Sequence, residues 1–124
     1  MEKNKIIQIA NKVYPNIRAY YGLGKKEYPP IEVHKNILAR LSGEPDAQGE
    51  PADAEYDRET NKLFIYSDYN NSVEDVIRSI IHEYVHYLQS GSWMKRYYSM
   101  GYKYGNHPYE ISAKKAEENW KMFA

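Results

Sequence analysis

The chain has 124 residues, enough to bury one hydrophobic core but not two, so we expect a single domain over residues 1–124. Its 17 basic and 17 acidic side chains balance, which argues against a protein that binds nucleic acid or an acidic membrane over its whole surface. The absence of cysteine excludes disulfides and thiolate zinc sites, and leaves histidine and carboxylate side chains as possible metal ligands.

The N-terminal segment predicts an amphipathic helix that packs across a sheet. Apolar side chains recur with helical spacing over residues 2–14, Pro15 interrupts the pattern, and residues 16–22 are compatible with its continuation. The segment lacks the apolar core and cleavage site of a signal peptide, and no stretch is apolar enough to cross a bilayer. We therefore expect a cytoplasmic protein with no membrane contact.

The middle of the chain predicts a small, mostly antiparallel sheet. Alternating apolar residues indicate a strand from about Ile31 into residues 38–41, with His34 facing solvent or a tyrosine rather than a metal.

An acidic segment rich in glycine and proline follows over residues 43–59, which is typical of a solvated loop. It leads into a strand near Ala54–Asp57. A turn over residues 58–61 and the compact apolar strand after it complete a predicted β-hairpin.

The next segment predicts a long, buried helix. Ser72 is a good N-cap, so the helix should run over residues 73–89 and end at Gly91. Apolar side chains surround its second half almost completely, and Glu83 carries the only formal charge between Ile80 and Gln89. A buried carboxylate of this kind needs a partner.

Residues 79–89, SIIHEYVHYLQ, contain an HExxH motif. His82 and His86 are four residues apart and project from one face of a helix, so both imidazoles can reach one ion. Glu83 would lie beside the ion, where its carboxylate can take a proton from an activated water. A lone histidine on an apolar face is usually a hydrogen-bonded core residue, but two that frame a glutamate favour a metal site. We expect Zn²⁺, although these ligand types also admit manganese, cobalt or iron.

Residues 90–108 combine Trp93 with four tyrosines and three basic side chains. One interpretation is a surface for single-stranded nucleic acid. The other is a loop whose rings pack over the metal helix and wall a cleft. The zero net charge and the lack of another basic patch favour the second interpretation.

Pro108 opens a last predicted helix, since proline is well tolerated at the first helical position. A catalytic zinc usually takes three protein ligands and leaves one position open. The downstream candidates for the third ligand are His107 and Glu110, of which Glu110 lies in the first turn of this helix.

The HEYVH motif in its apolar frame, followed by the helix that begins HPYEISA, resembles the gluzincin clan of zinc metallopeptidases. The similarity is to its smallest cytoplasmic forms, the minigluzincins and the peptidase domain of ImmA/IrrE-type proteins, and covers about residues 50–124. In that family the glutamate of the second helix is the third ligand, which carries over to Glu110. One feature departs from the family: an aspartate that supports a zinc-bound histidine four residues after this glutamate is replaced by Lys114.

The resemblance implies a minimal zincin-like α+β fold, with an N-terminal helix, a small sheet, the HExxH metal helix and a C-terminal helix that carries the glutamate. It also implies a Zn²⁺-dependent peptidase that acts on peptide or protein substrates. His82, His86 and Glu110 would hold the metal, and Glu83 would be the general base. His107 remains an alternative ligand, or it could stabilise an oxyanion, a role equally open to a tyrosine; the tyrosines considered are Tyr98, Tyr102 and Tyr109.

The alternative function is a latent or non-catalytic metal-binding domain that regulates a protein partner. So small a chain has little room for a deep cleft, and apolar residues of the C-terminal tail could fill what there is. These residues are Trp120, Met122 and Phe123.

Overall fold

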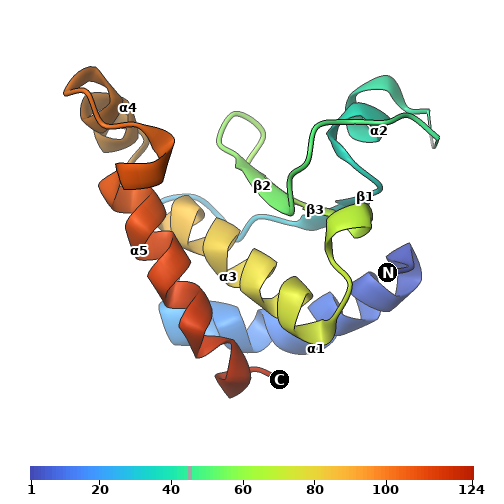
Figure 1. Ribbon diagram of the computed structural model, residues 1–124. Helices are drawn as coiled ribbons and strands as arrows, with labels where there is room; N and C mark the ends of the chain where they lie inside the picture. The colour runs from blue at the N-terminus through green and yellow to red at the C-terminus, as the bar shows by residue number, and fades with distance from the viewer. Residues whose placement is uncertain (45) are drawn as a thin grey trace.

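A computed structural model describes residues 1–44 and 46–124 (Figure 1). Within these residues the predicted α+β class is confirmed. None of their helices combines the length and the apolar character needed to span a membrane. In chain order the elements are α1 (Lys3–Tyr21), β1 (Ile31–His34), α2 (Ile37–Ser42), β2 (Ala54–Asp57), β3 (Lys62–Tyr66), η1 (Ser67–Tyr69), α3 (Val73–Leu88), α4 (Gly91–Ser99), η2 (Tyr104–Asn106), α5 (Pro108–Ala116) and η3 (Glu117–Met122), where η denotes a 3₁₀ helix.

The sheet has the strand order β1-β3-β2, so β2 is an edge strand. β2 and β3 form the predicted antiparallel hairpin, with Tyr56 opposite Leu63. β1 pairs with β3 in parallel, with Val33 opposite Ile65. The sheet is therefore mixed, with one parallel and one antiparallel pair of strands.

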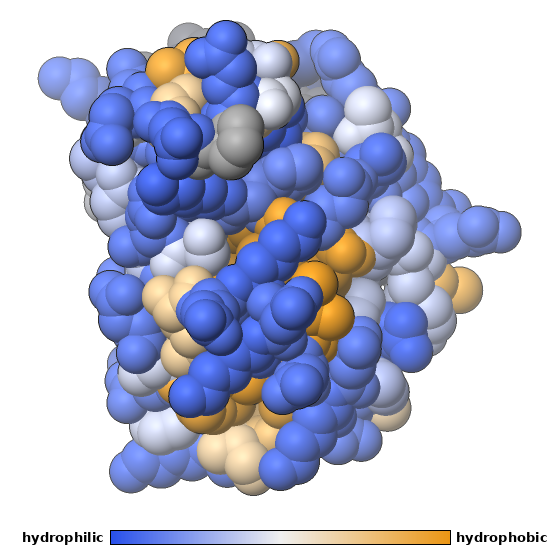
Figure 2. Space-filling view, turned by 90° about the vertical axis from the view of Figure 1, so that its right-hand side faces the viewer, coloured by the Kyte–Doolittle hydropathy of each residue, from blue (hydrophilic) through white to orange (hydrophobic). Residues whose placement is uncertain are grey.

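The core forms where α3 packs against α1, β2, β3 and α5 (Figure 1). Burial of each aliphatic side chain contributes about 1.5–3 kcal/mol, so this cluster is the main source of stability for so small a chain. The face of the molecule in Figure 2 is mostly hydrophilic, with apolar side chains exposed in a band near its centre. The core residues with no exposed surface include Ile6, Ile17, Leu63, Ile65, Val76, Ile77, Ile80, Ile81 and Tyr84.

α1 is one continuous helix that passes through Pro15 and ends at Gly22, so proline does not interrupt it. Pro15 is exposed, and its side of the helix faces solvent. Proline has no backbone N–H, so the carbonyl four residues earlier loses its helical hydrogen bond. That carbonyl can bind water instead, which limits the destabilisation that proline causes. Buried residues such as Val13 and Ile17 hold both halves of α1 against the core.

The predicted strand from Ile31 into residues 38–41 is wrong beyond His34, because β1 ends there and α2 follows. The buried side chain of Asn36 caps α2: its Oδ1 accepts a hydrogen bond from the backbone N–H of Ala39 at 2.8 Å. Its Nδ2 also donates to the carbonyl of Ala47 at 2.6 Å. An N-cap asparagine favours the start of a helix over the extension of a strand, and here it decides the local structure.

α3 begins as predicted, because Ser72 Oγ accepts a hydrogen bond from the N–H of Asp75 at 3.1 Å. It ends at Leu88. Gly91 does not simply end α3, as predicted, but begins α4, with Ser90 as the N-cap. The predicted loop over residues 90–108 is therefore wrong for the part that forms α4.

Candidate metal centre

α3 presents two histidines one turn apart at its C-terminal half. The Nε2 atoms of His82 and His86 lie 3.2 Å apart, and both side chains are largely buried. Their rings meet edge to face, with centroids 4.9 Å apart. The i, i+4 spacing thus brings both imidazoles to one point, as the motif predicts.

Glu110, in the first turn of α5, completes the group. Its Oε2 lies 3.1 Å from His82 Nε2, and its Oε1 lies 2.9 Å from His86 Nε2. Ligand atoms at about 2.1 Å from a tetrahedral zinc lie about 3.4 Å from one another. The observed separations are close to this value, so the three side chains could hold a metal ion.

The closeness of α3 and α5 depends on a small residue. Ala113, one turn after Glu110, has no exposed surface, and α5 packs directly against α3. A larger side chain here would push the helices apart and move the Glu110 carboxylate away from both imidazoles.

The other nitrogen of each histidine has a partner that orients the ring. Glu117 Oε2 lies 2.7 Å from Nδ1 of His82, and Gln89 Oε1 lies 2.7 Å from Nδ1 of His86. Acceptors at both Nδ1 atoms keep a proton on Nδ1, so Nε2 is the nitrogen that binds a metal once any proton on it is released. Neither Glu117 nor Gln89 was identified from the sequence.

Because Lys114 stands where the resembling family has a supporting aspartate, the support for His82 has to come from another residue, and Glu117 lies beside its Nδ1. It lies seven residues after Glu110, where η3 continues α5, and thus two turns along the same side. Arg78 Nη1 lies 3.8 Å from Glu117 Oε1 and provides a nearby positive charge. The seven-residue spacing is the signal in the sequence that could have indicated Glu117.

Gln89 joins the two helices at the site. Besides its contact with His86, its Nε2 donates a hydrogen bond to the carbonyl of Tyr109 at 3.1 Å. Tyr109 directly precedes Glu110, so one amide side chain orients a histidine of α3 and holds the first turn of α5.

Contacts among the histidines and carboxylates of this group shift their pKa values. Although burial acts in the opposite direction, hydrogen bonds to Glu110 and Glu117 raise the pKa of His82 to about 10. Burial likewise opposes the change at Glu110, but hydrogen bonds from His82 and His86 lower its pKa to about 2. A proton on His82 and a metal ion would therefore compete for the same acceptors.

Glu83 lies beside this group. Its Oε1 accepts a hydrogen bond from the backbone N–H of Tyr56 in β2 at 3.0 Å, and its Oε2 lies 3.9 Å from His82 Nε2. Burial raises the pKa of Glu83, while the nearby imidazoles act in the opposite direction. One carboxylate oxygen is therefore held by the edge strand, and the other faces the histidines.

His107 is not part of the group, so the prediction of His107 as an alternative ligand is wrong. It has no exposed surface: Nε2 lies 3.1 Å from the carbonyl oxygen of Met94, and Nδ1 accepts a hydrogen bond from the N–H of Tyr109 at 3.1 Å. The imidazole thus caps α5 and anchors α4. Because both of its nitrogens face backbone groups, it is not available to an oxyanion either.

A cleft of about 1130 Å³ opens beside His82, Glu83 and Glu110, whereas His86 does not line it. Residues 51–54, which lead into β2, form one wall of the cleft. Residues of α3, α5 and η3 form the others. Tyr104 and Gly105 also line it, whereas Tyr98, Tyr102 and Tyr109 do not. Desolvation and the charges of Glu110 and Glu83 raise the pKa of Tyr104 to about 12, so its hydroxyl is a donor at neutral pH.

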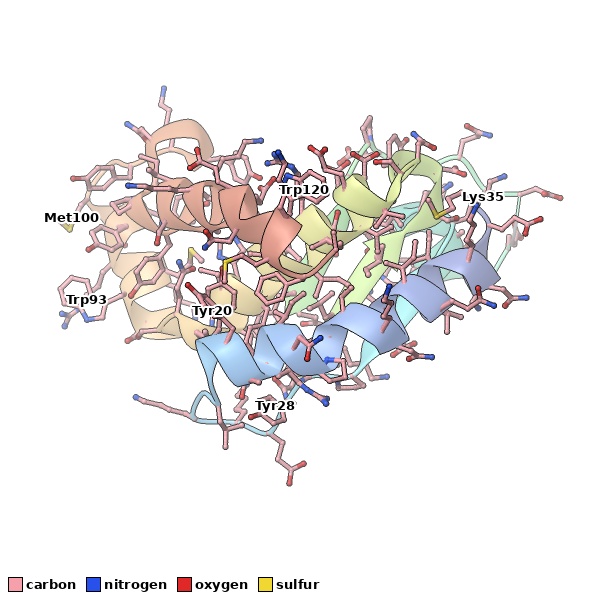
Figure 3. The ribbon with its side chains drawn as sticks, turned by 90° about the horizontal axis from the view of Figure 1, so that it is seen from below. Tyr20, Tyr28, Lys35, Trp93, Met100 and Trp120 are labelled. Carbon is pink, nitrogen blue, oxygen red and sulfur yellow. The ribbon has the colours of Figure 1, made fainter. Side chains whose placement is uncertain are left out.

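The C-terminal tail packs into the core and does not fill the cleft. Phe123 is buried, and its ring centroid lies 5.8 Å from that of Tyr20 and 6.4 Å from that of Tyr21, both in α1. Trp120 packs against the core as well, as its position between helices in Figure 3 shows, and Met122 is exposed. The prediction that these residues plug the cleft is therefore wrong.

No protein-family model, curated protein or solved structure matches this chain. The link to the zincins thus rests on the HExxH spacing and on the position of Glu110 within metal-binding distance of both histidines. These features are compatible with a zincin and with a metalloenzyme more generally.

Proposed function

We propose that this protein is a zinc-dependent peptidase in which His82, His86 and Glu110 hold the ion and Glu83 is the general base. The observation that supports this proposal best is the convergence of three ligand atoms, with the Glu83 carboxylate beside them, at the wall of an open cleft. Histidine and carboxylate ligands that leave a side open to a cleft suit a catalytic site better than a closed structural one.

A zinc ion bound there would polarise the carbonyl of the scissile peptide bond and lower the pKa of a water molecule. Glu83 takes the proton from that water and passes it to the leaving amine. Its Oε2 would carry this proton, because Oε1 already accepts a hydrogen bond from the N–H of Tyr56. Burial raises the pKa of Glu83, which favours retention of the accepted proton until it passes to the amine.

The edge strand β2 offers a way to bind an extended peptide. Its side away from β3 faces α3, where the N–H of Tyr56 reaches Glu83, and Ala54 lines the cleft. A substrate that lies antiparallel to this edge would gain main-chain hydrogen bonds and pass the catalytic carboxylate. Tyr104 lies on the wall next to Glu110, where its hydroxyl would donate to the developing oxyanion.

Glu83→Gln tests the catalytic role. The amide still accepts from Tyr56 N–H but cannot take a proton, so we expect zinc binding to persist and kcat on unstructured casein-like substrates to fall at least about 100-fold. His82→Ala should lose both zinc and turnover. Glu118→Gln is the matched control, since Glu118 is an exposed carboxylate of the same cleft.

If Glu83→Gln cleaves as fast as the parent, the general-base role is wrong. If the zinc-loaded parent cleaves nothing while zinc binding depends on His82, the alternative of a regulatory metal-binding domain is favoured instead.

A further inference from the structure

A segment next to the cleft leaves the body of the molecule and exposes most of its side chains. We define the arm as residues 91–106, which comprise α4, the loop after it and η2. α4 has no buried residue and stands away from the sheet and from α1 (Figure 1). Trp93 and Met100 point outward at the end of the molecule in Figure 3. The large apolar and aromatic side chains exposed on the arm are Trp93, Tyr98, Met100, Tyr102 and Tyr104.

The charge of the arm is of one sign. Lys95, Arg96 and Lys103 all lie on it and are exposed, and no acidic residue occurs between Glu83 and Glu110. The rest of the chain has all 17 acidic residues and 14 of the 17 basic ones, and so carries a net charge of −3. No carboxylate in residues 1–44 and 46–124 lies within 4.0 Å of these three cations. The arm therefore presents unneutralised positive charge.

The arm is held in place by aromatic packing. The Tyr97 ring contacts those of Trp93, Tyr102 and His107, with centroids 5.6, 5.5 and 5.4 Å away. The buried His107 ring in turn lies next to the backbone of Met94. An ordered aromatic surface loses less conformational entropy on binding than a loose loop would.

The base of the arm is part of the cleft, because Tyr104 and Gly105 line it. A ligand bound on the arm can thus continue towards Glu83. Six carboxylates line the cleft against three cations, Arg78, Lys114 and Lys115, so the excess of negative charge disfavours acidic residues of a ligand inside it. Negative charge on a bound chain would be placed outside the cleft, on the arm.

We propose that the arm docks an acidic, aromatic- or apolar-containing stretch of an unstructured polypeptide whose neighbouring residues enter the cleft. Lys95, Arg96 and Lys103 bind its carboxylates, and the exposed rings contact its apolar side chains. That the docked chain is then cleaved rests on the proposed peptidase function, but the docking itself does not require turnover.

The test measures binding with the zinc-loaded Glu83→Gln full-length protein, so that nothing is cleaved. The probes are three fluorescent peptides of equal length that share their apolar residues and carry glutamate, glutamine or lysine at the same positions. We expect the glutamate peptide to bind about tenfold more tightly than the glutamine peptide, as two or three exposed ion pairs would provide. The preference should fall as salt is raised from 50 to 200 mM.

The variants reverse charge on the arm or elsewhere. The double variant Lys95→Glu/Arg96→Glu should lose the preference for the glutamate peptide. Lys5→Glu/Lys12→Glu, a matched reversal at exposed positions of α1, should keep it. Circular dichroism confirms that both variants fold.

Each outcome decides the inference. It is overturned if the glutamate peptide binds no better than the glutamine peptide, if the arm variant keeps the preference, or if an oligonucleotide or an anionic phospholipid vesicle binds the arm more tightly than the peptide. A parent that cleaves no peptide while the arm-dependent preference persists would refute the proposed function and leave the docking site standing.

Discussion

At the scale of single residues, the orientation of the two imidazoles depends on Gln89 as much as on Glu117. Gln89 accepts from His86 and donates to the carbonyl of Tyr109, so it couples one proposed metal ligand to the backbone that carries another. Loss of a group that orients a metal-bound histidine usually weakens metal affinity by about 10- to 100-fold.

We therefore expect Gln89→Ala to weaken zinc binding by about 10- to 100-fold, whereas Gln89→Glu, which keeps an acceptor for His86, should retain most of the affinity. Competition with a chromophoric chelator measures this. Gln8→Ala, at an exposed position of α1, is the control. Parental affinity in Gln89→Ala would show that the ring of His86 is oriented by other contacts.

Zinc affinity should rise with pH between about 6 and 8, because zinc has to displace a proton from the site. The pKa of His82 is raised to about 10, so its imidazole remains protonated across this range. At higher pH the proton leaves the site more readily, so zinc binds more tightly. If one proton is released per zinc ion, the affinity rises about tenfold per pH unit. Calorimetry in buffers of different ionisation enthalpy counts the protons released. A count near zero, or an affinity that does not change with pH, would contradict this proton competition.

The ligands differ in how far the sequence could reveal them. His82 and His86 lie one helical turn apart, so their convergence follows from local geometry alone. The place of Glu110 depends on how α5 packs against α3; the residues alone left Glu110 and His107 as candidates for the third ligand, and the resemblance to a known family favoured Glu110. Glu117 lies seven residues after Glu110, a spacing that could have indicated it, whereas the role of Gln89 depends on a side-chain direction that spacing does not determine.

At the scale of elements, the boundaries were predicted well where caps and turns stand out, as at Ser72 and in the hairpin of β2 and β3. The prediction failed after His34, because the strand was extended into residues 38–41, whereas Leu38 and Leu41 lie exposed on α2. Asn36 determines the actual structure by accepting from Ala39 and donating to Ala47.

Asn36→Ala should lower the free energy of unfolding by about 1–3 kcal/mol, since it removes the cap and leaves the partly buried carbonyl of Ala47 without its donor. Asn36→Asp keeps the acceptor for Ala39 and should be intermediate. Urea denaturation measures both, and Asn71→Ala at an exposed position is the control. An unchanged midpoint in Asn36→Ala would show that α2 forms without its cap.

At the scale of the whole molecule, α3 is both the centre of the core and the carrier of the site. It packs against α1, the sheet, α5 and η3, so the positions of its histidines depend on every part that contacts it. The sequence showed that this helix is buried and where it begins. Which elements surround it, and that the chain end folds back onto α1, are long-range facts that neither periodicity nor capping can determine.

The chain end provides the sharpest test of this organisation. Phe123 is 7% exposed and packs on Tyr20 and Tyr21, so it anchors η3, and with it Glu117, to α1. Phe123→Ala should lower the free energy of unfolding by about 3–5 kcal/mol, as truncation of a buried phenylalanine does, and should weaken zinc binding through Glu117. Met122→Ala is the control in the same tail, because Met122 is 58% exposed. A latent peptidase with a tail in its cleft would behave differently: Phe123→Ala would raise turnover without loss of stability, and that result would overturn the role of the tail as part of the core.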